Sequence, residues 1–297
     1  MDIERKNNSL KSRVLKKMII LSKYKNNTFS SENVQKYINK NAKKKIKKGL
    51  FNGMQKNEYD KNIYYVYSNK SKNLLFYIHG GSFVEKPLYF QIKFVKKLAN
   101  KLNSDLIIPI YKTLPIGTAE ITLDQMIKLY KNMIEKYDNI YLVGDSAGGG
   151  AILSLAMSIS KTDLIRPKAI IALSPWLDLS LTNRRIVDFS DKDIVCSIEG
   201  NKYCGKLWAS NLDEKDYRVS AKYGDVKMLD NVFISSSSNE ICNPDCIDFV
   251  KELKKKKINY QYVEFLKQFH NFELYPIKES NLLIQDIFNF IQEVNHE

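Results

Sequence analysis

A serine lies at the centre of a G-D-S-A-G pattern at residues 144–148. Residues 140–143 directly precede the pattern, and their β-branched and aromatic side chains favour a buried strand. Residues 149–159 follow it and are small and apolar, which favours a helix. A serine between a strand and a helix, with glycines on both sides, is typical of a sharp, strained turn that exposes the hydroxyl. We therefore predict that Ser146 is a nucleophile, with the amide of Ala147 beside it as a donor to developing negative charge.

A serine hydroxyl needs a base to accept its proton and a third group to orient that base. The histidines of the chain are His79, His270 and His296. Around turns of this kind the order along the chain is serine, acid, histidine. His79 precedes the serine and His296 lies in the terminal tail, whereas His270 follows the last predicted strand. We therefore expect His270 to be the base.

Two carboxylates compete for the position of the acid. Residues 232–234 predict a strand, and Glu240 is the first carboxylate in the loop that follows. Asp245 comes five residues later, just after Pro244, where it could equally belong to the start of the next helix. Position in the loop favours Glu240, and Asp245 stays the alternative acid.

The segment H-G-G-S-F at 79–83 follows another predicted strand and contains three consecutive small residues, 80–82. Backbone N–H groups of Gly80, Gly81 or Ser82, together with that of Ala147, are the expected donors to a tetrahedral oxyanion. His79 is expected to shape this loop and not to act as a base. This chemistry requires no metal or organic cofactor, and the cysteine spacing predicts no zinc site.

These motifs, in this order, resemble the hormone-sensitive-lipase branch of the α/β-hydrolases, which includes many bacterial esterases and acetyl-ester hydrolases. The likeness spans roughly residues 74–275 and also includes Y-K-T-L-P at 111–115, S-P-W-L-D-L-S at 174–180, R-V-S-A-K-Y-G-D at 218–225 and H-N-F at 270–272. Ser82 replaces the usual third glycine of the H-G-G-G motif. Glu240 replaces the more common aspartate, and the family includes members with Glu at this position.

The resemblance implies ester hydrolysis through an acyl-enzyme on Ser146, with His270 as the base and Glu240 as the acid. Small soluble esters with short acyl groups, of the acetyl type, are the expected substrates. Two alternatives stay open: an amidase or peptidase with the same triad, and a non-catalytic protein that binds a small molecule on the same fold.

Strands and helices alternate over most of the chain, which predicts a mainly parallel sheet with helices on both faces, an α/β-hydrolase fold. The predicted strands are 63–67, 74–78, 106–110, 140–143, 169–173, 232–234 and 260–265, and the predicted helices are 88–102, 121–137, 149–159, 245–257 and 282–294. Residues 181–212 break the pattern, and we interpret them as an insertion over the carboxyl edge of the sheet.

The formal net charge of the chain is +14, but residues 1–50 hold 13 Lys and 2 Arg against three acidic residues, a net +12. Two basic amphipathic helices are predicted there, one within 5–25 and one that starts near Ser30 or Ser31. We divide the chain into a basic helical cap segment, 1–52, and an α/β-hydrolase catalytic domain, 53–297, with 181–212 as a second cap element. A solvated face explains the charge most simply, contact with an anionic surface is the alternative, and no specific nucleic-acid partner is expected.

The N-terminal region is polar, and its longest apolar run, 18–21, is too short for a signal peptide or a membrane span. The cysteines, Cys196, Cys204, Cys242 and Cys246, form no C-x-x-C pair. We therefore predict free thiols and a cytoplasmic location.

Overall fold

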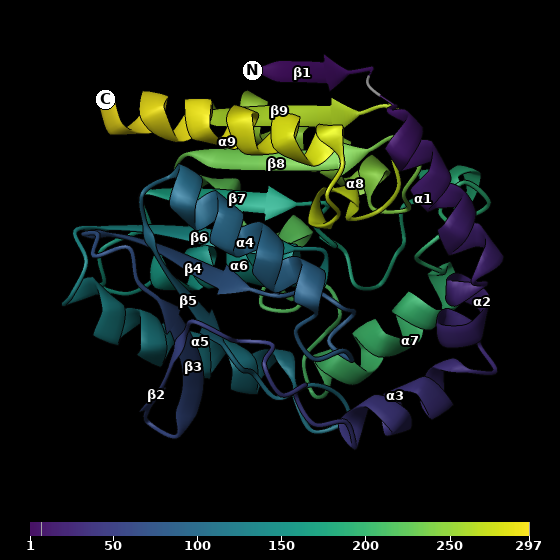
Figure 1. Cartoon of the computed structure of the whole chain (residues 1–297), viewed down its shortest axis with the longest axis horizontal. Helices are drawn as coiled ribbons and strands as arrows, with labels where there is room; N and C mark the ends of the chain where they lie inside the picture. The colour runs from purple at the N-terminus through teal and green to yellow at the C-terminus, as the bar shows by residue number, and fades with distance from the viewer. Residues whose placement is uncertain (7, 297) are drawn as a thin grey trace.

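A nine-stranded sheet crosses the molecule (Figure 1). The computed structural model describes residues 1–6 and 8–296. The strands are β1 (Asp2–Arg5), β2 (Gln55–Tyr59), β3 (Asn62–Tyr67), β4 (Asn73–Ile78), β5 (Asp105–Pro109), β6 (Asn139–Asp145), β7 (Ala169–Leu173), β8 (Val232–Ser237) and β9 (Tyr260–Phe265). They lie in the order β1-β9-β8-β7-β6-β4-β5-β3-β2, and among the strands of the described residues only the pairs β2–β3 and β3–β5 are antiparallel. The predicted fold, a mainly parallel α/β sheet, is confirmed.

Helices cover both faces of the sheet, with α4 and α9 on one face and α5, α6 and α8 on the other (Figure 1). The helices are α1 (Leu10–Leu21), α2 (Tyr24–Phe29), α3 (Val34–Ala42), α4 (Tyr89–Lys101), α5 (Ala119–Ile134), α6 (Ala147–Ile159), α7 (Ile198–Ala209), α8 (Asn243–Lys255) and α9 (Lys278–His296), with short 3-10 turns at Arg184–Phe189, Ala221–Tyr223, Val226–Met228 and Phe272–Leu274. Strand β4 shows why both faces need cover: Leu74 and Phe76 pack on one side, while Leu75 packs on the other.

The insertion at 181–212 contains helix α7, which the sequence pattern did not predict. The buried face of α7 includes Gly200, Cys204, Gly205 and Trp208. Glycines on that face remove the apolar period by which an amphipathic helix is recognised. A Cβ on Gly200 would lie 2.0 Å from the carbonyl oxygen of Phe29, so glycine lets α7 pack directly against the end of α2.

Two edge strands were also absent from the prediction. The first residues form β1, which pairs in parallel with β9, so the segment expected to be purely helical begins with a strand in the sheet. Strand β2 pairs with β3 at the opposite edge. Both strands are short, polar and largely exposed, so neither shows the apolar alternation by which strands are predicted.

The four cysteines are buried and unbridged, which agrees with the predicted free thiols. None of the helices within the described residues combines the length and the apolar character needed to cross a membrane.

Candidate active site

Ser146 occupies the turn between strand β6 and helix α6, with φ 53° and ψ −120°. Such a backbone conformation costs a non-glycine residue about 1–3 kcal/mol, so the surrounding packing must maintain it. A Cβ on Gly144 would lie 2.4 Å from the carbonyl oxygen of Gly148, and one on Gly148 would lie 2.1 Å from that of Ile78. The two glycines therefore permit the close packing that holds the serine in this turn.

The side chains of Ser146, His270 and Glu240 form one hydrogen-bonded chain. The Nε2 atom of His270 lies 2.8 Å from Oγ of Ser146, and its Nδ1 atom lies 2.8 Å from Oε2 of Glu240. The other oxygen of Glu240 accepts a hydrogen bond of 2.9 Å from the backbone N–H of Ser237. All three side chains are buried, and the carboxylate of Glu240 is fully so.

Topology explains how residues so distant in sequence meet. Strands β6, β8 and β9 run parallel, so their carboxyl ends lie at the same edge of the sheet. Ser146 follows β6, Glu240 lies in the loop after β8, and His270 lies in the loop after β9. The sheet therefore brings the three predicted residues together.

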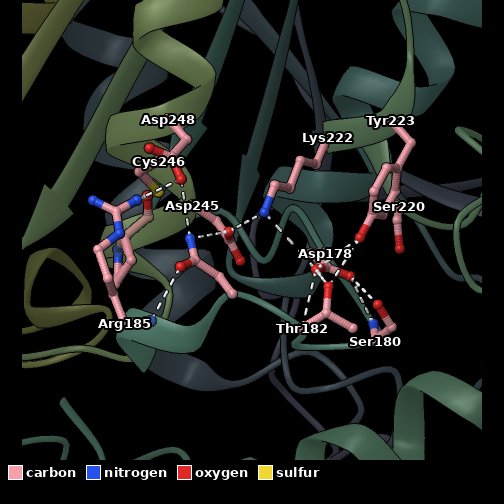
Figure 2. A network of polar contacts seen from close by, with 12 residues as sticks. Asp178, Ser180, Thr182, Arg185, Ser220, Lys222, Tyr223, Asp245, Cys246 and Asp248 are labelled. Atoms are coloured by element: carbon pink, nitrogen blue, oxygen red, sulfur yellow. Dashed lines mark hydrogen bonds and ion pairs between the residues drawn. The ribbon is translucent and has the colours of Figure 1, made fainter. Parts of the chain in front are cut away.

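Asp245, the alternative acid, lies in a separate polar network in the first turn of α8 (Figure 2). Its Oδ1 atom accepts hydrogen bonds from Nζ of Lys222 and from Nδ2 of Asn183. Lys222 stands between Asp245 and the fully buried Asp178, whose Oδ2 atom is 3.9 Å from the ammonium (Figure 2). The geometry thus places Glu240 against His270 and gives Asp245 other partners.

The loop after β4 carries the predicted oxyanion donors. A Cβ on Gly80 would lie 3.0 Å from Cβ of Ser146, so this loop passes close to the candidate nucleophile. The N–H of Gly80 donates a hydrogen bond of 3.0 Å to Oδ1 of Asp145 and is therefore already engaged. Gly81 and Ser82 follow with φ 112° and 50°, and Ala147 begins α6, where the N–H groups of the first turn have no acceptor within the helix.

His79 is fully buried at the start of the same loop. Its ring stacks on that of Tyr111 at a centroid distance of 4.4 Å, and the Tyr111 hydroxyl donates to the carbonyl oxygen of His79. Burial lowers the pKa of His79 to about 4, so this imidazole is neutral near neutral pH. These contacts agree with the predicted loop-shaping role.

Asp145, which sequence reasoning left without a role, connects three parts of the site. Besides Gly80, its carboxylate accepts hydrogen bonds from Tyr77 of β4, from Gln91 of α4 and from Asn271 beside His270. Burial raises the pKa of Asp145, although these hydrogen bonds favour its charged form. One buried carboxylate therefore joins the serine turn, the glycine loop and the histidine loop. In the sequence, only its position directly before Ser146 indicated that Asp145 could contribute to the site.

Comparison with known families identifies the fold. A family model described as the alpha/beta hydrolase fold matches residues 75–274, which is most of the chain. The chain belongs to the α/β hydrolase fold family.

Curated relatives of this hydrolase include enzymes named for ester cleavage. An esterase of Acinetobacter venetianus is 24% identical over 223 residues, covering 73% of this chain and 74% of the esterase. An acetyl-hydrolase of Streptomyces hygroscopicus is 20% identical over 204 residues, with 68% of each chain covered. The family match and these relatives identify the chain as a carboxylic ester hydrolase.

Solved structures show the same fold over nearly the whole chain. A hormone-sensitive lipase from a metagenome library superposes with a TM-score of 0.80 and 17% identity, covering 98% of this hydrolase and 99% of that chain. The structure of EstE5, soaked with p-nitrophenyl butyrate, gives a TM-score of 0.84 and 17% identity, covering 97% of this hydrolase and 99% of that chain. The resemblance to hormone-sensitive-lipase-like hydrolases is confirmed at the level of the fold.

Opposing effects act on the imidazole of His270 in this hydrolase. Burial disfavours the charged imidazolium, whereas the neighbouring Cys196 and Glu240 favour it. The balance raises the pKa of His270 well above its usual 6.5. A general base must be neutral to accept a proton, so activity should require a pH above this raised pKa.

We expect kcat/KM for p-nitrophenyl acetate to rise with pH through an ionisation whose midpoint lies above 6.5. Loss of the proton from His270 causes the rise. Replacing Glu240 with glutamine removes the charge that favours the imidazolium, so the pKa of His270 should fall. The kinetic profile of the wild-type enzyme and an NMR titration of the His270 ring in both proteins measure these values. A wild-type midpoint below 6.5 would contradict the raised pKa of His270.

A cavity of about 460 Å³ opens beside Ser146 and His270. The N-terminal segment contributes Ile19, Ser22, Tyr24, Phe29 and Lys47 to its lining, and the insertion contributes Val195 and Cys196. The cavity is therefore closed partly by each of the two segments that the sequence suggested as cap elements.

Glu85, another lining residue, connects the N-terminal helices α2 and α3 to the glycine loop and was not predicted. Its Oε1 atom accepts hydrogen bonds from the hydroxyls of Tyr24, at 3.1 Å, and of Tyr37. Burial raises the pKa of Glu85, while the two tyrosines partly offset that effect. The only sequence sign was a carboxylate placed just after the H-G-G-S-F segment.

Proposed function

We propose that this hydrolase cleaves short-acyl esters through an acyl-enzyme on Ser146. The observation that carries the proposal is the continuous chain from Ser146 Oγ through His270 to Glu240, with 2.8 Å at both contacts. These distances lie within the range needed for a nucleophile, its base and the group that orients the base.

In the proposed first step, Oγ of Ser146 attacks the ester carbonyl carbon while Nε2 of His270 accepts its proton. Glu240 accepts the hydrogen bond from Nδ1–H, which leaves Nε2 free to receive that proton and stabilises the imidazolium. The carbonyl oxygen becomes an oxyanion, for which we propose the N–H groups of Gly81, Ser82 and Ala147 as donors. Loss of one such donor costs roughly 3–4 kcal/mol in comparable sites.

Collapse of the tetrahedral intermediate breaks the bond to the alcohol, and His270 returns its proton to the leaving oxygen. The product is an ester between the acyl group and Ser146. A water molecule then attacks this ester and gives one proton to His270. His270 passes that proton to Oγ of Ser146 as the carboxylic acid leaves. The same three side chains serve both halves of the reaction.

The size and cover of the cavity support a small substrate. Its volume of about 460 Å³ lies in the range of small-molecule sites. We propose that residues 1–52 and 181–212 form the cap over the catalytic domain, 53–297, since both segments line this cavity. A partly covered site of this size favours short acyl groups over long chains.

A series of p-nitrophenyl esters from acetyl to palmitoyl tests this substrate class. We expect kcat/KM to be highest for acetyl to butyryl and to fall at least about tenfold for long acyl groups, because the cap limits the room beside Ser146. The acetyl anilide, run alongside as the matched amide, should be turned over far more slowly. A maximum at long chains, or faster turnover of the anilide, would contradict the proposal.

A further inference from the structure

Helix α1 presents an apolar stripe to solvent. Leu10, Val14, Met18 and Leu21 recur at helical spacing on one side of the helix, and they are 69%, 49%, 61% and 80% exposed. The helix lies along the outer edge of the molecule, between β1 and α2 (Figure 1). Large apolar side chains gathered in this way mark an interaction surface.

The opposite side of α1 packs against the rest of the hydrolase and forms hydrogen bonds with it. The exposure of the stripe therefore does not come from a helix without tertiary contacts. Oγ of Ser12 donates a hydrogen bond of 2.6 Å to Oε1 of Gln268, and Ser9 caps the helix and contacts Glu279. Leu15 and Ile19 pack against the core on the α4–α9 side of the sheet. The helix has one face fixed to the protein and one face turned to solvent.

The charges on α1 suit an anionic partner. Lys11 borders the apolar stripe on one side, and Arg13 and Lys17 border it on the other, all three exposed. The helix contains no acidic residue. Apolar side chains flanked by cations on a short helix are the pattern of a helix that lies in the plane of a lipid surface, where the cations face anionic headgroups.

The side of α1 opposite the stripe borders the active site. Ile19 in α1 and Ser22 directly after it line the cavity that also contains Ser146 and His270. A surface bound along the outer side of α1 would therefore be separated from that cavity by the width of this helix.

We propose that α1 is an interfacial helix that docks this hydrolase on an anionic lipid bilayer. The stripe of Leu10, Val14, Met18 and Leu21 enters the headgroup region, while Lys11, Arg13 and Lys17 contact lipid phosphates. Docking requires no turnover, so it can be tested separately from the proposed ester hydrolysis.

The test measures binding of the full-length Ser146→Ala protein to sedimented vesicles. We expect vesicles that contain phosphatidylglycerol to bind about 100-fold more tightly than pure phosphatidylcholine, with the difference reduced by salt. Replacing Leu10, Val14, Met18 and Leu21 together with serine should weaken binding at least about tenfold. Because these side chains are exposed, the variant should keep its thermal stability, which circular dichroism verifies.

Two charge variants separate a local surface from general basicity. Replacing Lys11, Arg13 and Lys17 with glutamine should remove the preference for anionic vesicles. The matched control replaces Lys254, Lys256 and Lys257, three exposed lysines at the end of α8 and just before β9, and should bind as the parent does. They lie near the amino end of β9, whereas α1 follows the carboxyl end of β1, which runs parallel to β9.

Three results would overturn the proposal. The first is equal binding to both vesicle types, or binding to neither. The second is unchanged vesicle binding by the four-serine variant, since charge alone would then explain attachment. The third is a dimer in analytical ultracentrifugation that the four-serine variant converts to a monomer without any vesicle binding, since the stripe would then cover a second copy of the chain.

Discussion

Replacing Ser146 with alanine is expected to lower kcat for p-nitrophenyl acetate by roughly 10⁴- to 10⁶-fold, to near the background rate. The substitution removes only the oxygen that lies 2.8 Å from His270, so the fold and the cavity should persist. Alanine also retains the strained turn between Gly144 and Gly148, and its thermal stability should stay close to that of the parent. Steady-state assays and a thermal melt measure the two effects.

Covalent labelling provides the control for this prediction. A fluorophosphonate probe should modify the wild-type chain once, at Ser146, and should leave the alanine variant unmodified. Peptide mass spectrometry locates the modified residue. A wild-type chain that the probe does not label would favour the alternative of a non-catalytic binding protein, and labelling at another serine would refute Ser146 as nucleophile.

Replacing Glu240 with glutamine should lower kcat/KM by about 10⁴-fold. In the wild-type protein, Nδ1 of His270 lies 2.8 Å from the carboxylate of Glu240. In the variant, the glutamine side chain can place its amide N–H against this Nδ1 atom. The ring proton then moves to Nε2, which loses its ability to accept the proton of Ser146. Kinetics with p-nitrophenyl acetate, on protein whose fold is verified by circular dichroism, measure the loss.

Asp245→Asn is the matched control, because it makes the same change in the other candidate acid. Asp245 pairs with Lys222, whose side chain is 22% exposed, so its replacement should cost about 2 kcal/mol in the free energy of unfolding. Its kcat/KM, measured below the unfolding transition, should stay within a few-fold of wild type. If Asp245→Asn reduces kcat/KM more than Glu240→Gln does, the role of acid passes to Asp245.

Local pattern was enough to predict the elements that position the site. Strand β6, helix α6 and the turn between them follow from an apolar run, two glycines and a small-residue helix within one short segment. The predicted helix between 88 and 102 corresponds closely to α4. Elements without a clear period were missed, namely the polar edge strands β1 and β2 and the glycine-lined helix α7.

By itself, then, the sequence determined the order of the serine, the acid and the histidine along the chain. It also determined the α/β fold that brings them to one edge of the sheet. It could do so because the serine turn and the strand and helix periods depend on neighbouring residues. Only the tertiary structure decided that Glu240 contacts His270 while Asp245 pairs with Lys222. It also decided that Asp145 engages the N–H of Gly80, and that the hydroxyls of Tyr24 and Tyr37 donate to Glu85. The partner in each of these contacts depends on how the whole sheet and the N-terminal helices pack, which no local pattern specifies.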